Sequence, residues 1–427
     1  MTRRRVVITG IGVVAPGSIG VKAFWGLLTD GRTATRRIST FDPTPFRSRV
    51  AAEIDFDPFA NGLTLQEVRR MDRATQIAVV ATREAVEDSG IELRKMDPHR
   101  VGVTVGTAVG ATISLDTEYS VVSDSGRLTL EDPEYAIPHL YDHMVPSSFA
   151  AEIAWVVGAE GESTVVSCGC TSGIDSVGYA VDLIREGSTD VMITGATDAP
   201  ISPITMACFD AIKATTPRED APERASRPFD RSRNGFVLGE GSAMFVLEEL
   251  EHAQARGASI YAEITGYASR CNAFHMTGLR PDGVEMAEAI RVALRDSRLN
   301  PDAIDYINAH GSGTKQNDVH ETAAFKRALG DHAYRTPASS IKSMVGHSLG
   351  AIGSIEIAAS TLAIKHNVVP PTANLHEPDG ECDLDYVPLQ ARDHRTDVVL
   401  TVGSGFGGFQ SAMVLADPNT LQKREDA

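Results

Sequence analysis

Short apolar runs alternate along the chain with longer segments in which apolar residues recur at helical spacing. The short runs are typical of buried strands, and the longer segments are typical of amphipathic helices. The expected strands are residues 6–9, 101–105, 190–195, 243–247, 261–267, 304–308, 398–401 and 411–415. The expected helices are residues 72–89, 146–157, 174–184, 248–256, 284–296, 318–329 and 351–364. This alternation predicts a layered α/β fold.

Four segments lack such a period and are expected to be irregular. Residues 30–63 predict a surface loop, and residues 341–350 predict a loop that precedes a helix. Residues 110–145 hold many acids and tyrosines and are expected to cover or line a site. Residues 10–17 contain the G-x-G-x-x-A pattern of dinucleotide-binding folds, but Pro16 would spoil the helix that must follow. We therefore expect a glycine-rich turn there.

The bulk composition narrows the class of protein. The 427 residues are 42% hydrophobic and 23% charged, which is typical of a globular protein with a large core. A net charge of −17 argues against general binding to nucleic acid or anionic membranes. Five irregularly spaced cysteines without a C-x-x-C motif predict neither disulfides nor a metal site, and they fit a cytoplasmic setting. No apolar run reaches the roughly 18 residues of a membrane span, and no signal peptide is expected.

The stretch from Val165 to Gly173 carries the first candidate for chemistry. Val165 and Val166 end a predicted strand and a helix follows at once, so Cys170 is expected at that helix's N-terminus. Unpaired N–H groups and the helix dipole favour a thiolate there, so the thiol should ionise easily. The same N–H groups can hold the oxyanion of an attacked thioester. On this stretch alone, a small buried hydrophobic residue is an equally good interpretation.

Two of the twelve histidines lie in similar glycine-rich settings. His310 lies where a strand ends, and His347 lies just before a helix. Near a thiolate, neutral imidazoles can act as bases or as donors to a developing oxyanion. Lys342 and Glu321 could form a pair that keeps the imidazoles neutral or oriented, with two solvated charges as the alternative.

Two further glycine-rich stretches are candidates for a catalytic or ligand-binding role. Residues 346–350 fit the G-x-S-x-G nucleophile elbow, which would make Ser348 the nucleophile. An elbow needs a strand immediately before it, and a strand ending near Ser340 would stop too early. Residues 403–408 lack the lysine of a phosphate loop. We expect their backbone N–H groups to approach a ligand, with Phe406 as a gate.

Taken together, these residues resemble the β-ketoacyl synthases of the thiolase superfamily over about residues 4–416. The matching motifs are the Cys170 turn, Asn308-Ala309-His310-Gly311 with Thr314, Asn317, Asp318 and Glu321, Lys342 to His347, Gly405 to Gly408, Arg227 to Asp230, and Gly239 to Gly241. The stretches 167–173, 208–212 and 403–410 look like the ketosynthase α subunit of bacterial type II aromatic polyketide synthases.

The resemblance implies an α/β thiolase-like fold of five layers, αβαβα, with two similar halves. Residues 1–258 would form the half with the nucleophile, and residues 259–427 the half with both histidines. It also implies an acyltransferase that catalyses a decarboxylative Claisen condensation. Cys170 would accept the growing chain, and His310 and His347 would donate hydrogen bonds to the malonyl thioester as carbon dioxide leaves. The N–H groups of Cys170 and Phe406 would hold the tetrahedral oxyanion.

The resemblance further implies supporting residues and partners. Lys342 and Glu321 would organise the histidine loop. No cofactor is expected, because an acyl carrier protein brings its own phosphopantetheine. The implied heterodimer partner is a chain-length factor, a related subunit that usually lacks the active cysteine. Because Cys170 is present, this chain looks like the catalytic subunit.

Three alternatives stay open at this point. A fatty-acid β-ketoacyl synthase would use the same chemistry on another chain, a non-catalytic subunit would only shape the tunnel, and a serine acyltransferase would use Ser348.

Two residues depart from the patterns of related synthases. Cys168 stands where a smaller or non-thiol residue is common and could compete in alkylation. Gly313 stands where fatty-acid synthases often have Ser.

Overall fold

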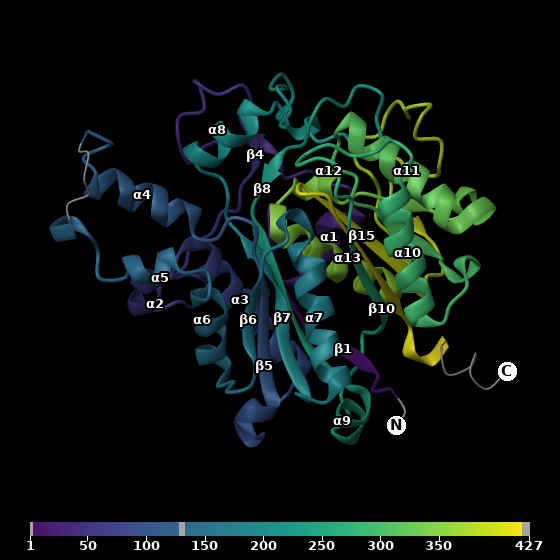
Figure 1. The fold of residues 1–427 in the computed structure, drawn as a ribbon, viewed down its shortest axis with the longest axis horizontal. Coiled ribbons are helices and arrows are strands. Elements are labelled where there is room, and N and C mark those ends of the chain that lie inside the picture. Colours follow the sequence, from purple (N-terminus) through teal and green to yellow (C-terminus); the bar gives the residue numbers. More distant parts are fainter. Residues whose placement is uncertain (1–2, 128–132, 421–427) are drawn as a thin grey trace.

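The computed structural model describes residues 3–127 and 133–420, and one large β-sheet runs through it (Figure 1). Within these residues the sheet has eleven strands, in the order β12-β11-β15-β16-β10-β1-β9-β7-β5-β6, with β2 paired to β1. The strands are β1 (Val6–Ala15), β2 (Ser18–Ile19), β5 (Val101–Gly106), β6 (Ser163–Val166), β7 (Val191–Asp198), β9 (Gly241–Glu249), β10 (Ala262–Cys271), β11 (Tyr306–Asn308), β12 (Ala338–Ser339), β15 (Val398–Gly405) and β16 (Phe409–Ala416).

The sheet consists of two halves with the same pattern of pairing. In the first half, β1 and β7 each pair antiparallel with β9, and β7, β5 and β6 are parallel neighbours. In the second half, β10 and β15 each pair antiparallel with β16, and β15, β11 and β12 are parallel neighbours. The halves meet where β1 pairs with β10. This repeated topology gives the two similar halves that the resemblance implies, and residue 258 falls in the connection before β10.

Helices form three further layers around the two half-sheets. Their bounds are α1 (Val21–Thr29), α2 (Leu65–Arg70), α3 (Arg73–Ser89), α4 (Thr112–Val122), α5 (Leu140–Met144), α6 (Ser148–Val157), α7 (Ser172–Glu186), α8 (Pro203–Ala211), α9 (Leu250–Ala255), α10 (Val284–Ser297), α11 (Lys315–Leu329), α12 (Lys342–Val345) and α13 (Ile352–His366). On one outer face α3 and α6 cover the first half-sheet, and on the other α10 covers the second, with α11 beside it. Between the half-sheets lie α7 and α13, which pack against each other. The fold is therefore the predicted five-layered αβαβα arrangement.

The central helix α13 shows why its sequence is apolar on all sides. Every residue from Ile352 to Ile364 is buried, because the helix contacts both half-sheets and α7. A helix buried on all sides has no polar face. The one acidic residue in this buried run, Glu356, therefore needs a partner inside the protein.

The glycines near the N-terminus lie inside a strand, so the predicted turn is wrong. A Cβ atom at Gly10 would lie 2.1 Å from the carbonyl oxygen of Ala85, and one at Gly12 would lie 1.8 Å from that of Ala81. Both carbonyls belong to α3, so the glycines allow this helix to pack directly on β1. They serve close packing between a helix and a strand.

Two segments predicted as loops contain short regular elements. Residues 30–63 include β3 (Arg36–Arg37) and β4 (Val50–Ala52), which form a small sheet with β8 (Leu238–Gly239). A second small sheet pairs β13 (Val368–Val369) with β14 (Arg392–Asp393). Residues 341–350 include α12. These elements are too short to show a hydrophobic period, so pattern analysis misses them.

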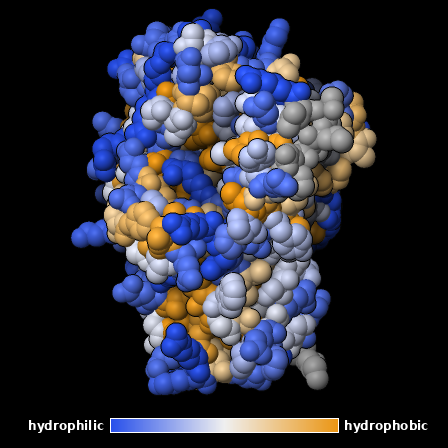
Figure 2. All heavy atoms as spheres, turned by 90° about the vertical axis from the view of Figure 1, so that its left-hand side faces the viewer, coloured by the Kyte–Doolittle hydropathy of each residue, from blue (hydrophilic) through white to orange (hydrophobic). Residues whose placement is uncertain are grey.

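The segment 110–145 also contains regular structure, although residues 128–132 lie outside the described part. Its helices α4 and α5 project from the body of the molecule, at the left of Figure 1. Figure 2 views the molecule from that side, where hydrophobic and hydrophilic residues lie next to one another. Large exposed side chains on α4, α5 and α6 are Tyr119, Val121, Tyr141, Met144 and Trp155. Beside them, β6 is the last strand at this end of the described sheet.

Candidate active site

Cys170 lies on a single 3₁₀ turn, Gly169–Thr171, between β6 and α7. Gly169 has a φ of +59°, in the left-handed region that favours glycine, and this turns the chain sharply from strand to helix. Cys170 therefore stands at the start of α7, as predicted. Its side chain packs beside Phe236 and Leu349 in a small apolar cluster.

The surroundings of the Cys170 thiol change its ionisation. Burial raises its pKa to about 12, against the opposing effects of the Lys342 charge and a hydrogen bond from the Phe406 backbone N–H. The predicted easily ionised thiol is therefore wrong for the resting site, because loss of water around the sulfur outweighs the helix N-terminus. The Phe406 N–H nevertheless lies beside the sulfur, where it can reach an oxyanion formed on a bound acyl group.

Phe406 lies in the tight turn between β15 and β16. Gly407 and Gly408 follow it with φ values of +91° and +89°, which only glycine adopts readily. Phe406 is 38% exposed, and the centroid of its ring lies 6.4 Å from that of the Phe209 ring. A partly exposed ring on a glycine turn beside the sulfur has the position that a gate requires, and that role stays a prediction.

His310 follows β11, in the loop that leads to α11. Its backbone N–H donates to Glu321 Oε1 at 2.5 Å, and that of Gly311 donates to Oε2 at 2.8 Å. The Lys342 Nζ donates to the His310 carbonyl oxygen at 2.5 Å and lies 3.4 Å from the ring atom Nδ1. Because an ammonium group only donates, Nδ1 is the acceptor and the proton of the neutral ring lies on Nε2.

His347 lies between α12 and a 3₁₀ turn, Leu349–Ala351. Its Nδ1 accepts a hydrogen bond from the backbone N–H of Leu349 at 3.2 Å. Its own backbone N–H donates to the carbonyl of Val237 at 2.8 Å, and its carbonyl accepts from Gly239 at 2.9 Å. A backbone N–H only donates, so the proton of this neutral ring also lies on Nε2.

The two imidazoles form a pair of neutral donors. Their ring centroids lie 5.4 Å apart and the ring planes are nearly perpendicular. Burial and the charge of Lys342 hold the pKa of each ring well below 6.5, so both stay neutral. His310, His347 and Cys170 all line one cavity of about 220 Å³. The structure thus brings together the three residues that the sequence places far apart.

The predicted pair between Lys342 and Glu321 is wrong, because the Lys342 ammonium pairs with Glu356 of α13. Both side chains are at most 1% exposed. Burial raises the pKa of Glu356 to about 7, while the Lys342 charge acts against this rise. Glu321 instead supports the loop through the backbone N–H groups of His310 and Gly311, and burial raises its pKa to about 8. Sequence analysis missed Glu356, although a lone acid in an apolar helix was its signal.

Asp198, at the end of β7, is a second residue that sequence analysis missed. It accepts hydrogen bonds from the Thr107 hydroxyl at 2.7 Å and from the Gly350 N–H at 2.7 Å. The N–H groups of Ala108 and Val109 complete its contacts. Burial raises its pKa to about 6. Asp198 thus joins a loop of the first half to the turn that follows His347, and its signal was an acid at a strand end.

The competing nucleophiles are poorly placed. The Ser348 hydroxyl is buried with no hydrogen-bond partner within the described residues, and Ser348 is not among the residues that line the cavity. The helix α12 separates it from β12, so no elbow forms. Burial and the neighbouring Asp175 raise the pKa of Cys168 to about 11. The Asp175 carboxylate accepts a hydrogen bond from that thiol, and Cys168 is not among the residues that line the cavity.

A thiol and two neutral imidazole donors around one cavity, in a duplicated five-layered fold, define a condensing enzyme of the thiolase type. The chain matches the β-ketoacyl synthase N-terminal domain over residues 3–253 and the β-ketoacyl synthase C-terminal domain over residues 261–376. It therefore belongs to the β-ketoacyl synthase family and is an acyltransferase.

Three relatives match this chain over nearly its whole length. The chain is 74% identical to a polyketide β-ketoacyl synthase 1 of Streptomyces virginiae, over 97% of this chain and 98% of that protein. It is 64% identical to the tetracenomycin polyketide synthase ketoacyl synthase α subunit of Streptomyces glaucescens, over 98% and 99%. It is 40% identical to 3-oxoacyl-[acyl-carrier-protein] synthase 2 of Coxiella burnetii, over 97% and 99%.

Two solved structures resemble the whole chain. One is a type II polyketide synthase acyl carrier protein in complex with its ketosynthase bound to a hexaketide, with a TM-score of 0.91 and 36% identity over 97% of this chain and 99% of that one. The other is the ishigamide ketosynthase/chain length factor, with a TM-score of 0.89 and 36% identity over the same shares. In the described part of this chain, no helix is both long and apolar enough to span a bilayer.

Proposed function

We propose that this chain is the catalytic ketosynthase subunit of a type II polyketide synthase. The observation that carries the proposal is the convergence of Cys170, His310 and His347 on one cavity, with both Nε2 protons available to a substrate. The high identity to polyketide synthase subunits favours a polyketide chain over a fatty-acid chain, for which the identity is lower. The intact Cys170 argues against a role confined to shaping the tunnel.

The first step is the loading of Cys170. Its sulfur attacks the thioester carbonyl of an acyl chain on a carrier protein, the bond from that carbonyl to the carrier's sulfur breaks, and the proton of the Cys170 thiol ends on the departing sulfur, which leaves as the carrier's thiol. The N–H groups of Cys170 and Phe406 hold the oxyanion of the tetrahedral intermediate. Because burial keeps the resting thiol protonated, Lys342 is the cation that stabilises the thiolate as it forms.

The second step is decarboxylation of a malonyl thioester. The bond between the carboxylate and the α-carbon breaks, carbon dioxide leaves, and the electron pair moves into an enolate. The Nε2–H groups of His310 and His347 donate to the enolate oxygen, and they need no proton exchange because both rings are already neutral. The α-carbon then attacks the Cys170 thioester, and the sulfur leaves as the β-keto product forms on the carrier.

The partners follow from the same proposal. An acyl carrier protein delivers both substrates on its own phosphopantetheine, so the chain itself uses no cofactor. A chain-length factor is the proposed second subunit, at the side of the molecule that carries α4, α5 and the edge strand β6. Exposed apolar side chains and an edge strand without an outer partner in the described sheet favour association with another chain. The proposed location is the cytoplasm.

Intact-protein mass spectrometry tests the proposal. The protein and its partner subunit are incubated with acyl-loaded carrier protein, as wild type and as Cys170→Ala, with Cys168→Ala as the matched control. We expect one acyl adduct on the wild type and on Cys168→Ala, mapped to the peptide with Cys170, and none on Cys170→Ala. An adduct that survives in Cys170→Ala and disappears in Ser348→Ala would establish the serine acyltransferase instead.

A further inference from the structure

Arg233 is a large charged side chain in the interior, and the chemistry above does not use it. Its side chain is 1% exposed, and it lies in the loop that leads into β8. Arginine is almost never fully buried unless its charge is paired. A guanidinium group at this depth therefore requires partners that the fold supplies.

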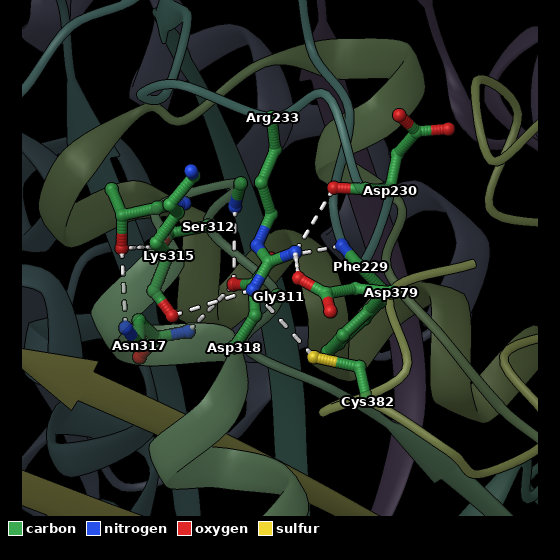
Figure 3. Close-up of polar contacts among 12 residues, drawn as sticks. Phe229, Asp230, Arg233, Gly311, Ser312, Lys315, Asn317, Asp318, Asp379 and Cys382 are labelled. Atoms are coloured by element: carbon green, nitrogen blue, oxygen red, sulfur yellow. Dashed lines mark hydrogen bonds and ion pairs between the residues drawn. The ribbon is translucent and has the colours of Figure 1, made fainter. Parts of the chain in front are cut away.

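The guanidinium group of Arg233 joins three separate segments of the chain (Figure 3). Its Nε lies 3.1 Å from Asp318 Oδ2, on the first turn of α11, and its Nη1 donates to Asp379 Oδ2 at 2.6 Å. It also donates to the carbonyl oxygens of Asp230 and Lys315, at 2.9 and 3.4 Å. A planar fork with five N–H donors suits this task, which a single ammonium group could not perform in full.

Asp318 connects Arg233 to the loop that contains His310, because it binds both. Its carboxylate accepts the N–H of Gly313 at 3.3 Å and that of Phe229 at 2.8 Å. One turn further along α11, Glu321 accepts the N–H groups of His310 and Gly311. Glu321 and Asp318 thus bind backbone N–H groups at both ends of the His310 loop. The positive charge of Arg233 lies next to the Asp318 carboxylate.

The loop held in this way forms part of the cavity wall. His310, Ser312 and Thr314 line the cavity, whereas Arg233 is not among its lining residues. Within the described residues, the hydrogen bonds and ion pairs of Arg233 and Asp318 reach neither Cys170 nor the Phe406 turn. The polar contacts of Arg233 and Asp318 therefore support the histidine side of the site.

We propose that Arg233 is a positioning residue for malonyl decarboxylation. It holds the His310 loop in place through Asp318 and does not act on acyl transfer to Cys170. This inference rests on the proposed function and adds a residue to it. It separates the two partial reactions: loss of the Arg233 charge impairs decarboxylation and spares acyl transfer to Cys170.

The test measures both partial reactions on Arg233→Met, Arg233→Lys and the wild type, each assembled with its partner subunit. Decarboxylation is followed as conversion of malonyl carrier protein to acetyl carrier protein, and loading as acylation of Cys170. We expect Arg233→Met to lower decarboxylation by about 100-fold and to leave acylation within about threefold of the wild type. Arg233→Lys should recover about tenfold, because an ammonium group can pair with Asp318 alone.

The pH profile adds a readout that a purely structural role would not change. Burial raises the pKa of Asp318, and the Arg233 charge opposes that rise. Without Arg233, Asp318 becomes protonated at low pH and loses acceptor capacity for the two N–H groups. As the pH is lowered, decarboxylation by Arg233→Met should therefore be lost at a higher pH than decarboxylation by the wild type, in which Glu321 and the other buried carboxyl groups are unchanged.

A parallel loss of decarboxylation and acylation in Arg233→Met, or unchanged decarboxylation, would overturn the inference. If Arg233→Met does not fold, the same two rates are compared for Arg233→Lys. We then expect decarboxylation to fall by about tenfold and acylation of Cys170 to stay within about threefold of the wild type. A wild type that neither decarboxylates malonyl carrier protein nor becomes acylated would instead refute the proposed function. The two failures are therefore distinguishable.

Discussion

His310 and His347 present the same chemical group to one cavity, but the protein holds them by opposite means. The Nδ1 of His347 is bound by a backbone N–H, that of Leu349, at 3.2 Å. The Nδ1 of His310 faces a side chain, the ammonium group of Lys342, at 3.4 Å. Both arrangements place the ring proton on Nε2, yet only the second depends on a charge, and that charge depends on Glu356.

The difference shows which parts of the site can be altered separately. A backbone donor stays in place whatever side chain the residue carries, so the tautomer of His347 is set by the path of the chain. A buried ammonium can be removed by one substitution, and its removal leaves a buried carboxyl without a partner. The His310 side is therefore the more easily damaged half of the donor pair.

The largest expected effect comes from Lys342→Met. His310 loses the donor that sets its tautomer, and Glu356 loses its counter-charge, so malonyl decarboxylation should fall by about 100- to 1000-fold. The measurement is the rate of acetyl carrier protein formation. Lys365→Met, the same change on the exposed part of α13, is the matched control and should retain the wild-type rate. Equal loss in both variants would show that the Lys342 contacts do not matter.

A smaller effect is expected from Glu356→Gln. Lys342 keeps its contacts with His310, but the ammonium no longer has a carboxylate partner, so decarboxylation should fall by about tenfold. The same assay of malonyl carrier protein measures it. A loss as deep as that of Lys342→Met would mean that the lysine acts through Glu356 and not through His310.

Acid should destabilise the protein through both histidines alike. Their pKa values are lowered in the folded protein, so below pH 6.5 only the unfolded chain takes up these protons. Stability is therefore lost as the pH falls, by about 1.4 kcal/mol per histidine from pH 7.5 to 5.5. Urea unfolding of the wild type, His310→Gln and His347→Gln at pH 7.5 and 5.5 measures this. Acid losses that are equal in all three proteins would contradict neutral buried rings.

The smallest effect is expected from Leu349→Met. The substitution conserves volume in the apolar cluster and leaves the backbone N–H that binds His347 in place. Decarboxylation should stay within about threefold of the wild type in the carrier-protein assay. A loss beyond tenfold would show that the side chain, and not the backbone, positions His347.

The sequence predicts the layers and the reacting residues but not the supports of those residues. Strands and helices are recognisable because a buried element imposes its period on many consecutive positions. Cys170, His310 and His347 are recognisable because each stands in a glycine-rich turn at the end of an element. The short sheet of β3, β4 and β8 imposes no such period, and no local pattern predicts it.

The supporting contacts are absent from the prediction because they join positions far apart in the chain. Lys342 and Glu356 are 14 positions apart, and Asp198 and Gly350 are 152 apart. Which acid meets which cation is decided by packing of the layers, so the sequence suggested Glu321 where the fold supplies Glu356. The pKa of Cys170 is higher than the sequence predicts for the same reason, because residues from both halves bury its thiol.

Neutron diffraction from a crystal of the protein in heavy water, at near-neutral pD, tests the comparison most directly because it locates deuterium on each ring nitrogen. We expect deuterium on Nε2 and none on Nδ1 of both His310 and His347, with a deuterated Lys342 ammonium group beside the first. Deuterium on Nδ1 of His310, or on both nitrogens of either ring, would contradict it, because the ring would then be reversed or charged and the pair of neutral donors would not exist.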